Sequence, residues 1–222
     1  LTVRASYQLL AYNRGVELYQ GGKYKQALVY FDKVRTYPID AQLAAESHYW
    51  EGECHFSLRD YVNATGSYSK FSRAPGGYLS KYYPAADYAR GYALFKRKKY
   101  SDALSAFRSY LEAHQEDAPK RIHDAELRTA DCFYAKKEFD RAVTYYDRCL
   151  DRTTENKGNV DYILYQRAMS ISLTEAAESL TEQIEGLDKL LIDFPKSRFV
   201  VDALYESART QIEQNELEDA RR

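Results

Sequence analysis

The chain has few cysteines, no long apolar run and no excess of charge of either sign. Three of its 222 residues are cysteines, and no two of them form a C-x-x-C pair: Cys54, Cys132 and Cys149. Such an odd and sparse set predicts neither a disulfide framework nor a zinc site. Free cysteine commonly behaves as a small buried apolar residue, so we expect all three in the core and expect no metal or other cofactor.

The balance of charge argues against one large class of partner. The chain carries 32 basic and 33 acidic residues, for a formal net charge of −1. A surface that binds nucleic acid or an anionic membrane needs a concentrated basic field. No apolar run approaches the roughly 18 residues of a membrane span. We therefore expect neither nucleic-acid binding nor a direct membrane span, and composition leaves the oligomeric state open.

Catalytic motifs are also missing from the sequence. The serine, histidine and aspartate residues show no nucleophile elbow and no local triad-like context. His48 and His55 are two helical turns apart, but Cys54 is expected to point elsewhere and no fourth ligand is near in sequence, which disfavours a metal site. We expect the protein not to be an enzyme.

Tyrosine is abundant, with 22 copies against one tryptophan and one methionine. Many of the aromatic residues recur at fixed distances from a repeated pair of small residues twelve positions apart. An aromatic residue lies three positions before the second member of four pairs, and another lies four positions after it. The pairs are Gly15 and Ala27, Gly52 and Ala64, Gly91 and Ala103, Ala130 and Ala142, and Ala208 and Ala220.

A fixed period of this size indicates stacked repeats. The second members of the pairs are 37, 39, 39 and 78 residues apart, and 78 is twice 39. Two antiparallel helices approach closely only where a side chain is nearly absent, and small residues at the crossing provide that contact. A helix hairpin of this kind cannot bury its apolar faces alone, so stacking on its neighbours must stabilise it.

These residues resemble the tetratricopeptide repeats. The best match is GVELYQGGKYKQALVYFDKVRTYPID, residues 15–40, with Gly22 and Tyr24 at the turn and Pro38 after the second helix. The resemblance implies an all-α fold, a right-handed superhelical α-solenoid of about five and a half helix hairpins. The period is longer than the family's commonest 34 residues. The stretch that begins DFPKSRFV, with Pro195 and Ser197, resembles the tetratricopeptide proteins of the bacterial cell envelope, of the outer-membrane assembly lipoprotein and periplasmic coordinator types.

We expect a single solenoid over residues 1–222. The predicted helices are 5–20 and 24–36, 41–57 and 61–73, 82–97 and 101–114, 120–136 and 140–151, 159–173 with a second helix that ends near 193, and 197–213. The corresponding repeats are about 5–40, 41–78, 82–117, 120–156, 159–195 and a truncated 197–222. The chain starts at Leu1, and Ala220 is expected to open another helix just before its end. We therefore interpret the chain as a fragment of a longer protein.

In the family, positions 2, 5, 9, 12 and 13 of each first helix line a concave groove. Here position 5 is aromatic in five repeats and position 12 in four, which predicts two rows of rings on one helix face. Two carboxylates lie between them. The predicted groove consists of Tyr12, Tyr19, Tyr49, Glu53, Phe56, Tyr88, Tyr92, Phe95, Asp131, Tyr134, Tyr165 and Tyr205. Packing between neighbouring repeats is the alternative role for both rows.

This groove favours a protein-interaction scaffold that binds an extended or helical protein segment, because tyrosine brings a large apolar body with little side-chain entropy. Some members of the family bind the terminal carboxylate of a partner peptide with several lysine and asparagine side chains. Here Arg209, at position 9 of the last repeat, is a single cation, so no carboxylate clamp of this kind is expected. Binding of glycan, peptidoglycan or another small ligand by the tyrosines is one alternative. A helper repeat region of a larger enzyme or sensor is another. The resemblance favours the periplasm or the outer membrane as the location, without fixing the compartment.

Overall fold

A computed structural model describes residues 2–152, 158–174 and 179–221. These residues form eleven α-helices and one 3₁₀ turn, and the described part of the chain contains no strand. The all-α prediction is therefore confirmed. The helices are α1 (Thr2–Gln20), α2 (Tyr24–Val34), α3 (Ala41–Ser57), α4 (Tyr61–Arg73), α5 (Tyr83–Lys96), α6 (Tyr100–Ala113), α7 (Pro119–Ala135), α8 (Phe139–Asp151), α9 (Val160–Ile171), α10 (Ser179–Asp193) and α11 (Val200–Arg221), and the 3₁₀ turn η1 is Gly77–Leu79.

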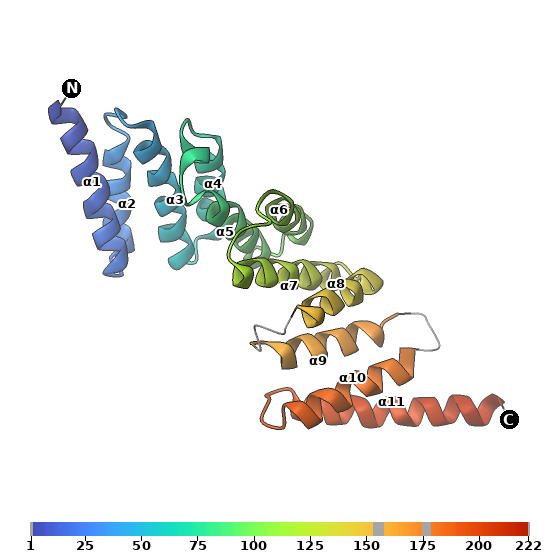
Figure 1. The fold of residues 1–222 in the computed structure, drawn as a ribbon. Helices are drawn as coiled ribbons and strands as arrows, with labels where there is room; N and C mark the ends of the chain where they lie inside the picture. Colours follow the sequence, from blue (N-terminus) through green and yellow to red (C-terminus); the bar gives the residue numbers. More distant parts are fainter. Residues whose placement is uncertain (1, 153–157, 175–178, 222) are drawn as a thin grey trace. The chain divides into compact units, whose positions relative to one another are not determined.

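The helices form two compact units. Unit 1 comprises Leu1–Gln115 with helices α1 to α6, and unit 2 comprises Glu116–Arg222 with helices α7 to α11. In unit 1, α1 to α4 run up and down beside one another (Figure 1). In both units consecutive helices pack on each other, as stacked hairpins require. The right hand of the superhelix and the single solenoid over the whole chain stay predictions.

Most predicted helix boundaries fall within two residues of the observed ones. The exceptions are the start of α1 at Thr2, three residues earlier than predicted, and both ends of α11, which begins at Val200, three residues later than predicted, and continues to Arg221. The sequence predicts that the helix of the sixth repeat ends near residue 213 and that Ala220 opens another helix. Both predictions are wrong, because α11 is one helix that continues through these positions. The stretch around Gln214 has neither glycine nor proline, and it continues the helix. The side chain of Ala220 lies outside the described residues.

Three glycines fit the crossing points of the hairpins, but each faces a ring. A Cβ atom on Gly15 would lie 2.6 Å from Cε1 of Phe31, and one on Gly52 would lie 2.6 Å from Cε1 of Tyr68. Gly91 has the same relation to Phe107, at 2.7 Å. The small residue of the first helix therefore makes room for the aromatic residue four positions after the repeat alanine.

In four hairpins, the turn that follows the first helix has the same backbone conformation. The residue after the helix C-cap has a positive φ of 71° at Gly22, 61° at Arg59, 59° at Lys98 and 63° at Lys137. At the second turn Asp60 N–H donates to the carbonyl of His55, and Arg59 N–H donates to that of Phe56. This pair of bonds is a Schellman motif, which satisfies carbonyls that the helix end leaves free.

All three cysteines are free and buried, as predicted. Burial raises the pKa of the Cys54 thiol to about 12 and that of Cys132 to about 12. Thiols held in the neutral form by burial are poor nucleophiles and metal ligands. Their role is therefore packing.

Candidate functional site

Two of the position-5 tyrosines stack on a ring of the following repeat. Tyr49 is 9% exposed and stacks on Tyr82, with ring centroids 4.7 Å apart and an interplanar angle of 7°. In unit 2, Tyr165 stacks on Phe199 in the same way, at 4.9 Å and 15°. Tyr205, by contrast, is 67% exposed on α11. Inter-repeat packing, the alternative role weighed for this row, is thus the role of Tyr49 and Tyr165.

The position-5 tyrosines of the first and third hairpins, Tyr12 on α1 and Tyr88 on α5, are half-buried. The hydroxyl of Tyr12 donates to Oε2 of Glu46 at 2.7 Å and accepts a bond from Nε1 of Trp50 at 3.0 Å. Tyr88 lies edge-on to Tyr92, with centroids 5.1 Å apart. These rings keep part of their surface open to solvent while their neighbours fix their orientation.

The position-12 rings lie at the turn end of each hairpin and are half-buried. Each packs against the aromatic residue that begins the second helix of the same hairpin. These contacts lie within one hairpin, while Tyr19 also contacts Trp50 and donates to Glu53 of the next repeat. The pairs are Tyr19 with Tyr24 at 5.5 Å between ring centroids, Phe56 with Tyr61 at 5.3 Å, Phe95 with Tyr100 at 5.5 Å and Tyr134 with Phe139 at 5.7 Å.

The two predicted groove carboxylates are already bound by tyrosine hydroxyls. Glu53 accepts from Tyr68 at 2.8 Å and from Tyr19 at 3.3 Å. Burial raises the pKa of Glu53, although the tyrosine donors oppose that change. We therefore leave Glu53 out of the surface offered to a partner.

Asp131 is held in the same manner in unit 2. It accepts from the hydroxyls of Tyr146 at 2.8 Å and Tyr162 at 2.9 Å, and Arg128 donates to its second oxygen. Burial raises the pKa of Asp131, and this effect exceeds the opposing effect of Arg128. Asp131, which is 6% exposed, is also left out of that surface.

Position 9 and the aromatic position of the second helix vary together. Where the ring is a tyrosine, a carboxylate faces it, as in Tyr68 with Glu53. Where the ring is Phe31, position 9 is Val16. A buried hydroxyl needs a hydrogen-bond partner and a phenyl ring does not, which explains the pairing. Sequence spacing alone predicts the face of each residue but not this bond.

Two contributors to this region, Trp50 and Ser80, were not predicted. Trp50 lies between the first two repeats and contacts Tyr19, with ring centroids 5.0 Å apart, as well as bonding Tyr12. Glu46 is 6% exposed and accepts from Oγ of Ser80 at 2.8 Å. The signal that could have revealed Trp50 is its status as the chain's single tryptophan, placed beside a position-5 tyrosine.

A Ser-x-aromatic segment joins neighbouring repeats in each unit. Ser80 bonds Glu46, and two residues later Tyr82 stacks on Tyr49. In unit 2, Oγ of Ser197 donates to Oδ2 of Asp161 at 2.5 Å, and Phe199 stacks on Tyr165. The Pro-x-Ser stretch noted in the sequence thus anchors the start of α11.

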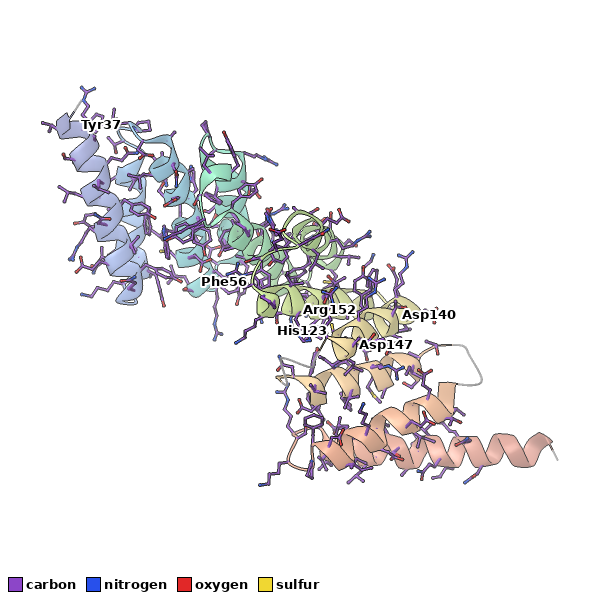
Figure 2. The ribbon with its side chains drawn as sticks, viewed as in Figure 1. Tyr37, Phe56, His123, Asp140, Asp147 and Arg152 are labelled. Carbon is purple, nitrogen blue, oxygen red and sulfur yellow. The ribbon has the colours of Figure 1, made fainter. Side chains whose placement is uncertain are left out.

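The surface that remains is the aromatic face of unit 1, carried by α1, α3 and α5. Its rings are half-buried, and Figure 2 labels one of them, Phe56 on α3. The face offers apolar ring surface with a few hydroxyls and no free carboxylate from Glu53. It consists of Tyr12, Tyr19, Trp50, Phe56, Tyr88, Tyr92 and Phe95.

Unit 2 contains a polar cavity of about 540 Å³. Arg128 on its wall bonds Asp131, and Asp161 is bound by Ser197. Tyr162 on the same wall donates to Asp131, so the polar groups around the cavity hold α7, α9 and the start of α11 together. Its lining residues are Arg128, Asn159, Asp161, Tyr162, Arg198 and Phe199.

Two further features are absent from the described residues. They contain no group of three or more histidine, cysteine, aspartate and glutamate side chains that could hold a metal ion. Among these same residues, no helix has both the length and the apolar character needed to cross a bilayer.

Comparison with known proteins agrees with the repeat architecture. The chain is similar to YrrB, described as a TPR protein with an unusual peptide-binding site, with a TM-score of 0.69 and 19% identity over 88% of this chain and 90% of that one. It is also similar to MamA from Desulfovibrio magneticus RS-1, with a TM-score of 0.67 and 16% identity over 86% and 97%. No curated protein matches the chain.

Two family models match different parts of the sequence. A tetratricopeptide repeat model matches residues 12–78, and the model of the outer membrane lipoprotein YfiO matches residues 80–221. The second model alone spans more than half of the 222 residues. This chain therefore belongs to the YfiO outer membrane lipoprotein family and is built from tetratricopeptide repeats.

Proposed function

We propose that this protein is a non-catalytic scaffold that binds a segment of a partner protein along the aromatic face of unit 1. The observation that carries the proposal is that the position-12 rings stay half-exposed while the neighbouring position-5 ring of Tyr49 is buried. Partly exposed rings on a rigid frame bury much area on binding and lose little side-chain entropy.

The contacts of these rings support a preorganised surface. Tyr19 is held by Trp50 and Tyr24, and Tyr12 is held by hydrogen bonds to Glu46 and Trp50. Rings already fixed in one rotamer give affinity without a further ordering cost. Such a surface fits an apolar stretch of a partner, with the hydroxyl of Tyr12 and the rims of the rings to orient it.

The family supports a place for this scaffold in the bacterial cell envelope. The YfiO model, which matches residues 80–221, describes an outer membrane lipoprotein. The similar YrrB structure is described as having a peptide-binding site, which agrees with a peptide or protein segment as the ligand. An envelope location and a peptide ligand are both part of the proposal.

The test uses peptides selected from a random display library on the whole chain. Phe56→Ala with Phe95→Ala removes two rings from the aromatic face. We expect affinity to fall at least about tenfold, as loss of hot-spot rings does. The matched control, Val29→Ala with Val62→Ala, removes side chains of α2 and α4 that are 55% and 62% exposed and lie outside the aromatic face. This control should cost less than about threefold in affinity.

Equal losses in both pairs of variants would show that stability, and not the aromatic face, governs binding. Failure to select any peptide, together with saturable binding of soluble peptidoglycan fragments, would contradict the proposal and favour the glycan alternative. Circular dichroism of each variant provides the check on folding.

A further inference from the structure

We propose that one edge of unit 1 binds the surface of an anionic lipid bilayer. This inference is independent of the aromatic face. The edge is formed by the start of α1, the connection from α2 to α3 and the segment around η1, which reach the same border of unit 1 (Figure 1). Figure 2 labels Tyr37 at this border and Phe56 at the opposite one.

The edge exposes large apolar side chains. Tyr78 is 70% exposed and Leu79 is 64% exposed, both in η1. Tyr37 and Ile39 are also exposed, in the α2–α3 connection. Tyrosine and aliphatic side chains at one border suit the interfacial layer of a bilayer, where rings sit at the level of the headgroups.

Internal contacts hold the three segments together. The rings of Tyr7 and Tyr37 are 5.9 Å apart, and the side chain of Gln8 bonds both backbone groups of Asp40 at 2.8 and 2.9 Å. Gly76 lies so close to the start of α3 that an added Cβ would be 3.0 Å from the nitrogen of Gln42. The edge is thus one continuous surface.

The η1 segment is held in one conformation. Gly76 has a φ of 81°, and an added Cβ on Gly77 would lie 2.4 Å from the carbonyl oxygen of Phe71. Within the turn, Leu79 N–H donates to Gly76 and Ser80 N–H donates to Gly77. These N–H groups need no water, so the exposed tip can enter a headgroup layer without leaving them unsatisfied.

The charge of the edge indicates which kind of lipid surface it would bind. Arg4, Arg73 and Lys81 are exposed there, and the guanidinium of Arg4 lies 5.0 Å from the centre of the Tyr37 ring. The nearby carboxylate of Asp40 accepts a bond from Leu43 N–H as the cap of α3. The net charge of the whole chain predicts no such surface, but the fold gathers these cations at one border.

Cations beside exposed rings and aliphatic groups match a surface of anionic lipid. The groups are also spread over three segments along a border, which suits a planar surface better than a single peptide. An acidic protein is the other possible partner, and the experiment separates the two.

The experiment is sedimentation of the whole chain with vesicles of phosphatidylcholine alone or mixed with phosphatidylglycerol. We expect binding to the mixed vesicles that weakens as salt is added. Tyr78→Ser with Leu79→Ser should lower the partition coefficient about tenfold or more, since each side chain leaves an interface. Arg73→Gln with Lys81→Gln should lower it about fivefold for each cation removed.

The control is Val62→Ser with Ile192→Ser, which removes exposed aliphatic side chains, 62% and 77% exposed, from other places. It should leave the partition coefficient unchanged. Absence of binding to the mixed vesicles, or an equal loss in the control and the η1 variant, would overturn the proposal. The proposal would likewise be overturned if the wild-type chain does not bind vesicles but binds an acidic protein through Tyr78 and Leu79.

Discussion

At the scale of single residues, the packing of each repeat depends on positions that have no side chain. Gly15, Gly52 and Gly91 each leave room for a ring of the second helix of the same hairpin. A methyl group at any of them would overlap an aromatic carbon buried in the core, where the ring cannot move freely. The recurrence of glycine here is therefore a packing requirement, which the spacing in the sequence located correctly.

Gly52→Ala should destabilise the protein by about 1–3 kcal/mol, because its Cβ would lie 2.6 Å from the Tyr68 ring. Gly66→Ala is the matched control in the adjacent helix α4, where an added Cβ meets nothing within 4 Å. That substitution should stabilise the protein by about 0.5–1 kcal/mol through helix propensity. Urea titration of both variants measures the difference, and the same sign for both would contradict the packing argument.

The bond from Tyr68 to Glu53 has a predictable value. Tyr68→Phe removes a donor from a buried carboxylate and should cost about 1–3 kcal/mol of unfolding free energy. Tyr78→Phe removes an exposed hydroxyl and should change stability by less than about 0.5 kcal/mol. Adding Glu53→Val to Tyr68→Phe recreates the pairing of Val16 with Phe31 and should recover part of the loss. No recovery would mean that Glu53 stabilises the fold by other contacts.

The pH dependence of stability should carry the signature of Glu53. Burial raises the pKa of this carboxyl in the folded state, so between the unfolded and folded values the native protein binds more protons. Its contribution is therefore fully present below the unfolded pKa and is lost as pH rises through the folded pKa. Glu53→Gln keeps the shape without the charge, so its melting temperature should exceed that of the wild type most at pH 7 and least near pH 4. A gap that widens as pH falls would contradict this assignment.

At the scale of elements, the left-handed residue in the turn between paired helices was predictable from the sequence at only one of its four positions. Gly22 marks the first turn in the sequence, and the structure has the same left-handed residue at Arg59, Lys98 and Lys137. A side chain costs about 1 kcal/mol in this conformation, so the sequence offers no signal there except the position in the repeat.

Lys98→Gly should accordingly stabilise the protein by about 1 kcal/mol, because glycine adopts a φ of 59° without strain. Gly22→Ala tests the converse at the equivalent position of the first hairpin and should cost about as much. Differential scanning calorimetry of the two variants checks both signs. A destabilised Lys98→Gly variant would show that the lysine side chain has a role of its own in the turn.

The helix boundaries were largely predictable, because the glycines, prolines and capping aspartates at Asp40 and Asp60 are local signals. The end of α11 was not. The pair Ala208 and Ala220 follows the spacing of the other hairpins, but the intervening residues favour continued helix, and Ala208 is exposed on it. Spacing indicates a turn only where the chain between can break.

At the scale of the whole molecule, stability should be distributed along the stack. Each hairpin contacts mainly its neighbours, so a local defect should be felt locally. Hydrogen exchange of Gly52→Ala should rise in α3, α4 and adjacent helices while α10 and α11 keep their protection. Leu187→Ala, which truncates a fully buried side chain of α10, should give the reverse pattern. A uniform rise in both variants would instead indicate one cooperative unit.

The candidate site was predicted in part. Spacing correctly assigned Tyr12, Phe56 and their equivalents to the first helices, because helical periodicity fixes which residues share a face. It could not separate Tyr49, which stacks on Tyr82, from Phe56, which stays half-exposed. That difference depends on a ring 33 residues further along the chain, placed by the bond of Ser80 to Glu46.

The sequence by itself determined the repeat, the helix hairpins and the positions of the small residues, because these follow from contacts within one turn of helix or between paired helices. Only the tertiary structure decided that Glu53 and Asp131 serve buried tyrosines, that Trp50 joins two repeats, and that scattered cations and rings meet at one edge of unit 1. The physical reason is range. Periodicity governs which face a residue occupies, whereas burial and hydrogen bonding depend on atoms that the next repeat brings beside it.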